Sequence, residues 1–433
     1  MAEIRAFRGT FFNHQRIEDV SRALAPPYDV IDEQRRQDLV SRSPYNIVRL
    51  IMPEPGLERD FWDASAATFR AWKDDRILVR DASRCIYAYR QTFNLPEAGM
   101  TSRSGILAAL RCRNLGSGDI LPHEKTFPHT REERLNLLRA CEANFSQIFT
   151  VFRDPGQEAM DSLERAMTGA SCLDVTDVEG VRHQLWRMED HGQVAALARI
   201  IRDRKLIIAD GHHRYETANI YSKDVPGGKD TNQAALYVSV AMFRSEDPGL
   251  IILPVHRILR GCHVSDGEVR DRIGRYFEVE ELRGDILANQ GMLQARLEES
   301  RRPAFVMIIT NGYALLRLRP GVDPVGCIEG PESNSWKRLD VSVLHTLVLR
   351  EALGLDADRL AEEGRLYFTP WESKALGDVS EGRADAAFIM RPTLIEDIWR
   401  IARGGERMPH KSSYFYPKLP SGLVIYDHAT ALS

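Results

Sequence analysis

The sequence predicts an α+β fold, in which helices and strands follow one another irregularly along 433 residues. Two observations favour this class. Some stretches, such as 58–73, repeat apolar residues at helical spacing, whereas others, such as 206–209, are short continuous apolar runs of the kind found in buried strands. The hydrophobic content of 43% with 28% charged residues is typical of globular proteins. A chain of this length is expected to form two or three domains.

The N-terminal part, residues 1–118, is expected to contain loops, one amphipathic helix and a β-hairpin. Aromatic residues recur at helical spacing near 58–73; they are Phe61, Trp62, Phe69 and Trp72. The stretches RCIYAYRQTF (84–93) and SGILAALRC (104–112) read as strands separated by a polar loop. Two adjacent strands with a polar connection predict a hairpin.

A capped helix is predicted next. Thr130 and Glu133 have the spacing of a capping box, in which the two side chains bond the free backbone N–H groups of a helix start. The helix is expected to run to about residue 142, with Leu135 and Leu138 on its buried face.

The stretch 190–221 reads as helix, strand, tight turn and helix. QVAALARIIRD carries apolar residues on one helical face, LIIA is a short buried strand, and HHRYETANIY has helical character. Two more strands are predicted, ALYVSVAMF at 235–243 and LIILPVH at 250–256, the second after an Asp-Pro-Gly turn signal.

The C-terminal third again alternates helices and strands. Its expected elements are a strand pair near 304–318, a helix at 341–353 capped by Asp340, a strand at 386–390, a helix at 394–403 between a Thr393/Glu396 capping box and Gly404, and a strand at 422–426. We therefore expect an N-terminal part (1–118), a core (119–260) with an insertion near 145–190, and a C-terminal α+β domain (261–433).

Charge and composition indicate where the protein works. The net charge of −4 gives no electrostatic reason to expect nucleic acid or an anionic membrane as the main partner. No signal segment opens the chain, and no apolar run reaches 18 residues. The six cysteines show no CxxC pair or zinc spacing. A reduced, cytoplasmic protein is expected.

The turn within LIIADGHHRYETANIY (206–221) is predicted to bind phosphate. A strand that enters a helix through Asp-Gly leaves backbone N–H groups and the positive end of the helix dipole facing an incoming anion. Gly211 has no Cβ to keep the anion away from the backbone. Arg214 can bond two phosphate oxygens, and His212 and His213 can donate from their rings. Asp210 would repel phosphate unless it holds magnesium or orients a histidine.

Two other interpretations of this turn stay open. It can be a surface turn with solvated histidines. It can also be a zinc site formed by His212 and His213, although adjacent histidines point in different directions and no HxxxH or HxH pattern accompanies them.

The sequence DGHHR, followed by Ala218, resembles the phosphate-binding box of the ParB/sulfiredoxin superfamily. ParB has Gly-Glu-Arg-Arg at this place, and sulfiredoxin has Gly-Cys-His-Arg. Because His212 stands where sulfiredoxin has its catalytic cysteine, that chemistry is excluded. The box is most similar to that of the free-serine kinases, which reads Asp-Gly-His-His-Arg. The resemblance implies a ParB-like core in which this turn holds the phosphates of ATP or ADP, with CTP as the alternative known from ParB.

Over its whole length the chain is similar to the bacterial family catalogued as domain of unknown function 1015. The family name supplies no activity. The stretches that carry this resemblance are APPYDVI (25–31), PYNIVRLI (44–51), LPHEKTF (121–127), RLNLLRACEANFSQIF (134–149), IADGHHRYETA (208–218) and RMPHKSSYFYPKLPSGLV (407–424).

Glu124, in LPHEKT, is the position that matches the catalytic glutamate of the free-serine kinases, and the resemblance implies that it is the base. A carboxylate near a hydroxyl can accept the proton that the hydroxyl loses as it attacks phosphorus. His123 either orients Glu124 or is itself the base. A surface ion pair between Glu124 and Lys125 or a nearby arginine is the structural alternative.

Further candidates for contact with substrate or phosphate lie in the family-matching stretches, and they are Lys125, Lys411, Lys418, Tyr28, Asp29 and Asn46. The charged, aromatic loop RMPHKSSYFYPK (407–418) suits a carboxylate, a phosphate or a nucleobase. Tyr28, Asp29 and Asn46 either line a cleft or only form turns. His256, in LPVHRIL, is interpreted as a structural histidine.

These features predict a magnesium-dependent kinase that transfers phosphate from ATP or ADP to the hydroxyl of a small metabolite, with free L-serine as the expected acceptor. Magnesium is assigned to Asp210. The alternatives are a ParB-like switch that binds CTP or ATP, and a phosphatase or nucleotidase that uses the same phosphate cradle. No helix-turn-helix or basic segment is evident, so neither DNA nor a membrane is expected as a partner.

Overall fold

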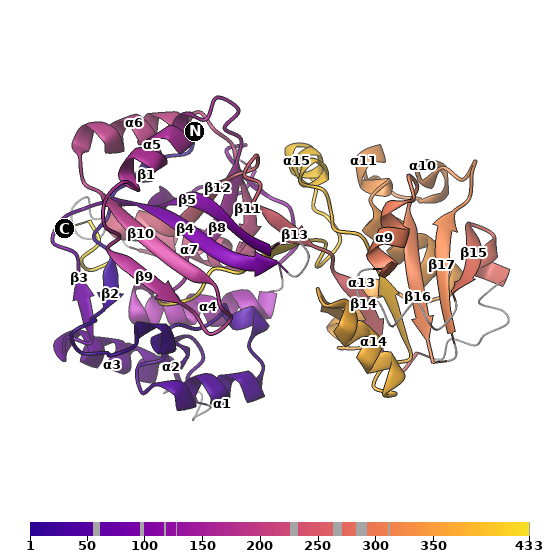
Figure 1. Ribbon diagram of the computed structural model, residues 1–433, viewed down its shortest axis with the longest axis horizontal. Coiled ribbons are helices and arrows are strands. Elements are labelled where there is room, and N and C mark those ends of the chain that lie inside the picture. Colours follow the sequence, from indigo (N-terminus) through magenta and orange to yellow (C-terminus); the bar gives the residue numbers. More distant parts are fainter. Residues whose placement is uncertain are drawn as a thin grey trace. The chain divides into compact units, whose positions relative to one another are not determined.

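The computed structural model describes residues 1–54, 61–95, 99–116, 118–126, 128–225, 233–262, 271–282, 292–310 and 312–432. The chain divides into two compact units. The first unit consists of Met1–Pro122, Thr126–Ile251 and Pro417–Ser433, and the second of His123–Lys125 and Ile252–Tyr416. Helices and strands occur in both units, which confirms the α+β class (Figure 1).

A mixed β-sheet forms the centre of the first unit. Its strands are β1 (Ile4–Arg5), β4 (Ile86–Leu95), β5 (Gly99–Arg111), β6 (Ile120–Pro122), β8 (Ile148–Phe152), β9 (Leu173–Thr176), β10 (Arg182–Met188), β11 (Leu206–Asp210) and β12 (Tyr237–Arg244). They follow the order β6-β11-β8-β12-β5-β4-β10-β9, and β1 pairs with β5. β11 therefore lies between a parallel neighbour, β6, and an antiparallel one, β8.

Helices cover this sheet on both sides. They are α1 (Glu33–Arg42), α2 (Val48–Ile51), α3 (Phe61–Asp74), α4 (Pro128–Cys141), α5 (Glu158–Ala166), α6 (His191–Arg202) and α7 (His212–Asp224). In Figure 1, α5 and α6 lie on one side of the sheet, and α1 to α4 on the other. α4 packs against α7 and α3. Leu138 of α4 and Ala218 of α7 join one hydrophobic core with the strands. No helix in the described part of the chain is long and apolar enough to cross a lipid bilayer.

Several predicted elements of this unit are confirmed. The aromatic helix is α3, which buries Phe69 and Trp72. The hairpin is formed by β4 and β5, but these strands pair as far as Leu95 and Gly99, so the polar loop is shorter than predicted. Polar residues there continue the ladder because backbone hydrogen bonds, which do not depend on side-chain polarity, hold it together.

The prediction of a capping box at Thr130 is wrong. α4 begins at Pro128, so Thr130 lies inside the helix and not at its cap. Proline suits the first helical position because its missing N–H would have no partner there. Leu135 and Leu138 are buried, as predicted.

The expected insertion near 145–190 is part of the central sheet. β8 lies between β11 and β12, and β10 pairs along its whole length with β4. Since β5 and β12 also pair, residues on both sides of the boundary expected at 118 share one sheet. The structure thus divides the chain into two units rather than three.

The second unit has its own antiparallel sheet. Its strands are β14 (His256–Leu259), β15 (Phe277–Leu282), β16 (Ala304–Ile309), β17 (Gly312–Leu318), β18 (Leu366–Thr369) and β19 (Ala386–Ile389), in the order β15-β17-β16-β19-β14-β18. Its helices are α9 (Met292–Glu298), α10 (Pro324–Cys327), α11 (Asn334–Lys337), α12 (Asp340–Val343), α13 (Ala357–Glu362), α14 (Glu372–Ser380) and α15 (Ile395–Arg403). A π-helix, η5 (Leu344–Ala352), continues α12.

The strand pair near 304–318, the strand at 386–390 and the helix ending at Gly404 are confirmed. Both predicted caps in this unit are wrong. Asp340 is the first residue of α12, and its carboxylate pairs with Arg391 at 2.8 Å. Thr393 donates to the carbonyl of Ser412 at 2.6 Å instead of capping α15. Tertiary partners have replaced the local ones.

His256 is a structural histidine, as predicted. It is buried on β14, and its Nδ1 accepts a hydrogen bond from the backbone N–H of Met390 at 3.2 Å. Burial lowers the pKa of His256 to about 3, and the neighbouring charge of Arg257 acts in the same direction. The ring therefore stays neutral.

The last segment of the chain, from Pro417 onward, belongs to the first unit. The buried guanidinium of Arg103 holds its start by donating to the carbonyl of Pro417. Its end pairs through β21 (Tyr426–Asp427) with β7 (Ala143–Asn144). The strand predicted at 422–426 is reduced to this short pairing and a bridge from Ile425 to Thr10. This return places Lys418 within the first unit.

His428, in this segment, should make stability depend on pH. Burial lowers the pKa of His428 to about 3, and neither ring nitrogen has a hydrogen-bond partner among the described residues. The unfolded chain therefore binds a proton below about pH 6.5 that the folded protein does not. The contribution of His428 to the free energy of unfolding should be fully present above that pH. It should fall by about 1.4 kcal/mol per pH unit as the pH is lowered towards 4.

His428→Phe should reduce this slope in urea unfolding measured between pH 4 and 8, since the ring packs between Tyr221 and Tyr426 without needing a polar partner. The matched control is His14→Phe, because His14 is exposed. An unchanged slope in His428→Phe would contradict the assignment.

Candidate functional site

The predicted phosphate-binding turn joins β11 to α7. Gly211 stands between them with φ 89° and ψ 29°, in the left-handed region that favours glycine. Gly211 is the N-cap residue of α7 and has no side chain with which to cap the first turn. The positive end of the helix dipole and the backbone of this turn therefore remain suited to an anion.

Arg214 lies back over the turn. A Cβ on Gly211 would come within 3.0 Å of Nη2 of Arg214, so the guanidinium rests against the glycine. Its Nη2 donates to Oδ2 of Asp210 at 2.7 Å, and its Nη1 to the carbonyl of Gln147 at 2.6 Å. The fork predicted to grip a phosphate is thus occupied by groups of the protein itself.

Lys418 is the second cation at the turn. Its Nζ forms an ion pair with Oδ1 of Asp210, and both side chains are 12% exposed. Arg214 is similarly buried, with 13% exposure. Arg214 and Lys418 together bring two positive charges to the single carboxylate of Asp210. This local excess of positive charge favours an anion.

The two histidines differ in their environments. His212 is buried with 6% exposure, whereas His213 is partly exposed. Solvated histidines therefore do not describe this turn. Among the described residues no group of three His, Cys, Asp or Glu gathers as a metal site would require. The zinc interpretation has no support from these positions.

Magnesium does not fit Asp210 in this arrangement. A magnesium ion needs carboxylate or phosphate oxygens around it. Both oxygens of Asp210 already face cations, Oδ2 the guanidinium of Arg214 and Oδ1 the ammonium of Lys418. An ion at Asp210 would have to displace Lys418, so we derive no step through magnesium.

Tyr28 lies close to the turn at Gly211, whereas the side chain of Asn46 has a structural role elsewhere. Burial raises the pKa of Tyr28 to about 12, Asp29 adds to this, and the charges of Arg134 and Arg214 oppose it. Asp29 itself is exposed. Asn46 is fully buried, and its amide donates to the carbonyls of residues 22 and 24 while its Oδ1 accepts from the N–H of residue 48. Its side chain therefore holds a turn together, which is the structural alternative for this residue.

His123, Glu124 and Lys125 belong to the second unit. Ser413 Oγ donates to Oε1 of Glu124 at 3.4 Å and lies 2.7 Å from Nε2 of His123. Because the serine proton is then used, Nε2 of His123 is the donor to Ser413. His123 is fully buried, whereas the side chain of Glu124 is 16% exposed. Of the two roles open to His123, this arrangement supports orientation of Glu124 through Ser413.

A buried cation lies close to Glu124. Burial lowers the pKa of Arg257 to about 9, and the charge of Glu124 opposes this shift. Arg257 also donates from Nη2 to the carbonyl of Lys411 at 3.0 Å. Lys125 is exposed, and its Nζ lies 3.9 Å from a carboxylate oxygen of Asp358. Lys125 therefore forms its ion pair with Asp358 and not with Glu124.

Sequence reasoning missed three residues that stand out here, Ser413, Arg257 and Arg134. Ser413 and Arg134 lie within family-matching stretches, but serine and arginine are common and carry no motif there. Arg257 follows His256 in a strand, where an arginine that is 1% exposed is unexpected. Only burial distinguishes these side chains from others of their type.

Comparisons with known proteins confirm one resemblance. The family model described as "Protein of unknown function (DUF1015)" matches residues 4–342. No curated protein sequence matches the chain. Among solved structures, the chain is similar to a conserved hypothetical protein from Pyrococcus furiosus, with 14% identity and a TM-score of 0.35 over 70% of this chain and 90% of that one.

The chain is also similar to a free serine kinase in complex with AMP, with 13% identity and a TM-score of 0.35 over 70% of this chain and 88% of the kinase. A truncated form of SbnI from Staphylococcus aureus shows 12% identity and a TM-score of 0.34 over 72% of this chain and 84% of that one. At these TM-scores, the roles of residues rest on their own geometry.

Gly211→Ala should destabilise the first unit by about 1–2 kcal/mol, because an alanine at positive φ is strained. The new Cβ would also push the guanidinium of Arg214 away from Asp210. Urea unfolding would measure the loss. Gly169→Ala is the matched control, since a Cβ there meets nothing within 4 Å. Equal stability of the two variants would contradict the geometry described for the turn.

Proposed function

The chain belongs to the DUF1015 family, and we propose that it is a nucleotide-dependent phosphotransferase whose DGHHR turn holds the nucleotide phosphates. We further propose that the acceptor is the hydroxyl of a small metabolite, with free L-serine as the first candidate. The similarity of the box at residues 210–214 to that of the free-serine kinases supports both statements.

One observation carries the proposal: groups that suit an anion gather at the start of α7. Gly211 adopts a left-handed conformation at the start of the helix, and Arg214 and Lys418 form ion pairs with Asp210 beside it. Backbone N–H groups, a helix dipole and two cations are the features by which proteins bind phosphate. Buried donors of this kind act strongly because water does not screen them.

Asp210 holds the two cations that we propose bind phosphate. Without nucleotide, its carboxylate neutralises Arg214 and Lys418, so neither cation is buried without a counter-charge. A phosphate group offers the same cations more oxygens and more negative charge than one carboxylate does. Nucleotide binding would therefore draw Arg214 or Lys418 from Asp210 to the phosphate. The two cations supply the positive charge that phosphoryl transfer needs.

Glu124 as the catalytic base stays a prediction from the family resemblance. Its side chain supports that role in two ways: part of it is exposed, and Ser413 holds one of its oxygens. A carboxylate in such a position can accept the proton of an attacking hydroxyl. His123 and Ser413 would then be positioning residues, since they act through Glu124.

Phosphorus NMR of the purified protein with ATP, ADP or CTP and a panel of amino acids tests the proposed function. We expect O-phosphoserine as product. In Glu124→Gln, nucleotide binding should persist while transfer falls by a factor on the order of 100 or more, because the amide cannot accept the proton. Lys125→Gln is the matched control on the neighbouring, exposed residue.

The other outcomes each point elsewhere. Nucleotide consumed at the same rate without any amino acid would indicate a hydrolase, and binding without turnover would indicate a switch. A fully active Glu124→Gln variant would remove Glu124 as base without touching the role of the turn.

Arg214→Ala should weaken ADP binding by about 1.5–3 kcal/mol, the usual cost of losing a hydrogen bond to a charged group. Isothermal titration calorimetry measures this change. Lys223→Ala removes a cation from the exposed end of the same helix and should bind ADP as the unaltered protein does. Unchanged affinity in Arg214→Ala would count against the turn as the phosphate site.

A further inference from the structure

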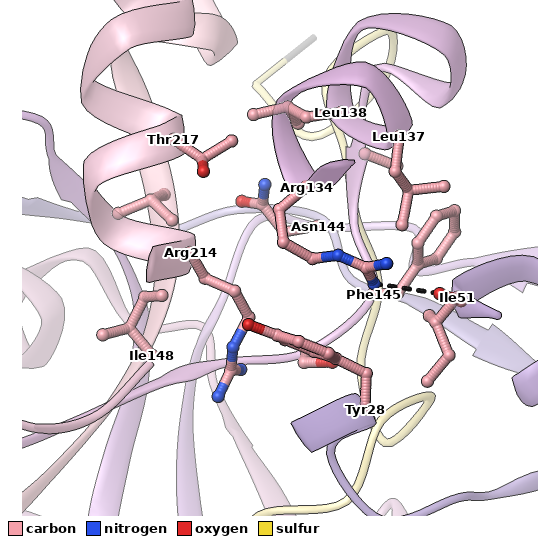
Figure 2. A pocket seen from close by; sticks show the side chains of 13 residues that line it. Tyr28, Ile51, Arg134, Leu137, Leu138, Asn144, Phe145, Ile148, Arg214 and Thr217 are labelled. Carbon is pink, nitrogen blue, oxygen red and sulfur yellow. Dashed lines mark hydrogen bonds between the residues drawn. The ribbon is translucent and has the colours of Figure 1, made fainter. Parts of the chain in front are cut away.

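A cavity of about 60 Å³ lies within the first unit, between α4, α7 and the strands β7 and β8. Figure 2 shows Arg134 of α4 and Arg214 of α7 on either side of the ring of Tyr28. Arg134 faces the cavity because it shares a helical face with Leu137 and Leu138, three and four residues further along α4. The proposed function assigns no role to this cavity.

Arg134 is the unusual residue of the cavity wall. Its Nη1 donates to the carbonyl of Ile51 at 2.9 Å, and its guanidinium carbon lies 4.3 Å above the ring centroid of Tyr28 (Figure 2). No carboxylate among the described residues comes within the 4.0 Å of an ion pair with it. Burial lowers the pKa of Arg134 and the charge of Arg214 adds to this, whereas Tyr28, Glu133 and Asp29 oppose it. A partly buried cation that has no carboxylate in direct contact and lies near a second cation favours an anion nearby.

A further donor near the cavity has no acceptor in the described chain. Nε of Arg134 is buried and has no hydrogen-bond partner there, and Tyr28 also lines the cavity. Burial raises the pKa of Tyr28 to about 12, so its hydroxyl keeps its proton and can donate. The polar end of the cavity thus offers N–H and O–H groups but no carboxylate.

The rest of the wall is mainly apolar. Leu137, Leu138, Ile148 and Val238 contribute buried side chains to it. A phosphate ion would place some of its four oxygens against these hydrocarbon groups, which costs free energy because those oxygens lose their hydrogen bonds to water. An organic acid has its two charged oxygens at one end only, so its hydrocarbon part can pack against the leucines. The lining therefore favours a carboxylate over phosphate.

The size of the cavity limits the ligand. A water molecule needs about 10–15 Å³ of such space, so about 60 Å³ admits a molecule of roughly four or five non-hydrogen atoms. A nucleotide is far too large for it. Short organic acids have the required size.

We propose that this cavity binds the carboxylate of a small organic acid, with Arg134 and Tyr28 donating to the carboxylate and the short hydrocarbon part packed against Leu137 and Leu138. The inference goes beyond the proposed function, because such binding requires neither nucleotide nor phosphoryl transfer. Arg214, which lines the cavity and also lies over Gly211, would couple the two sites.

Saturation-transfer NMR with propionate as the probe tests the inference on the full-length protein. Propionate has five non-hydrogen atoms and should bind, whereas propionamide, which has the same shape without the charge, should bind at least about tenfold more weakly. Arg134→Gln should weaken propionate binding by about tenfold or more. Arg139→Gln makes the same change on the exposed side of α4, where Arg139 pairs with Asp224, and should bind propionate normally.

Ala143→Leu provides a second variant that keeps both arginines and fills the cavity, since Ala143 lines it. It should also weaken propionate binding by about tenfold or more, because the added atoms take the space of the ligand. ADP titrations of Arg134→Gln separate this inference from the proposed function, since ADP binding at the turn should persist in that variant.

Three outcomes would overturn the proposal. The first is the absence of a propionate signal at tens of millimolar. The second is propionate binding that persists in both Arg134→Gln and Ala143→Leu. The third is inorganic phosphate that binds more tightly than propionate and no longer binds in Ala143→Leu. The last outcome would assign the cavity to phosphate instead.

Discussion

The ion pairs of Asp210 with Arg214 and Lys418 are the constraint on which the candidate site depends. Three charged side chains that are 12–13% exposed are stable only because each has an opposite charge in contact. They tie the end of β11, the first turn of α7 and the last segment of the chain together. A ligand that changes this balance must itself be charged, which favours phosphate at the turn.

The central sheet positions these groups. β11 ends at Asp210 beside β8, and Gln147, just before β8, offers its carbonyl to Arg214. Arg103 of β5 holds the carbonyl of Pro417, which delivers Lys418 next to Asp210. Because these contacts join residues 67 to 314 positions apart, the site forms only when the first unit has folded.

Arg214 and Arg134 show how burial gives similar residues different tasks. Arg214 has a carboxylate partner and rests on Gly211, whereas Arg134 has a carbonyl and an aromatic ring but no carboxylate among the described residues. In the second unit, the negative charge of Glu124 partly offsets the effect of burial on the pKa of Arg257. A buried guanidinium without a full counter-charge is costly, so an anion beside it would stabilise the protein.

The sequence by itself determined the local elements: the α+β class, the amphipathic helix at 61–74, the β4–β5 hairpin, and the strand-turn-helix around Gly211. These follow from periodicity and from the one residue that tolerates positive φ, and both act over a few neighbouring residues. Tertiary structure alone decided that residues 148–152 run through the central sheet, that Asp340 meets Arg391 instead of capping a helix, and that Lys418 reaches Asp210. Such partners are chosen by the packing of distant segments, which no short-range pattern encodes.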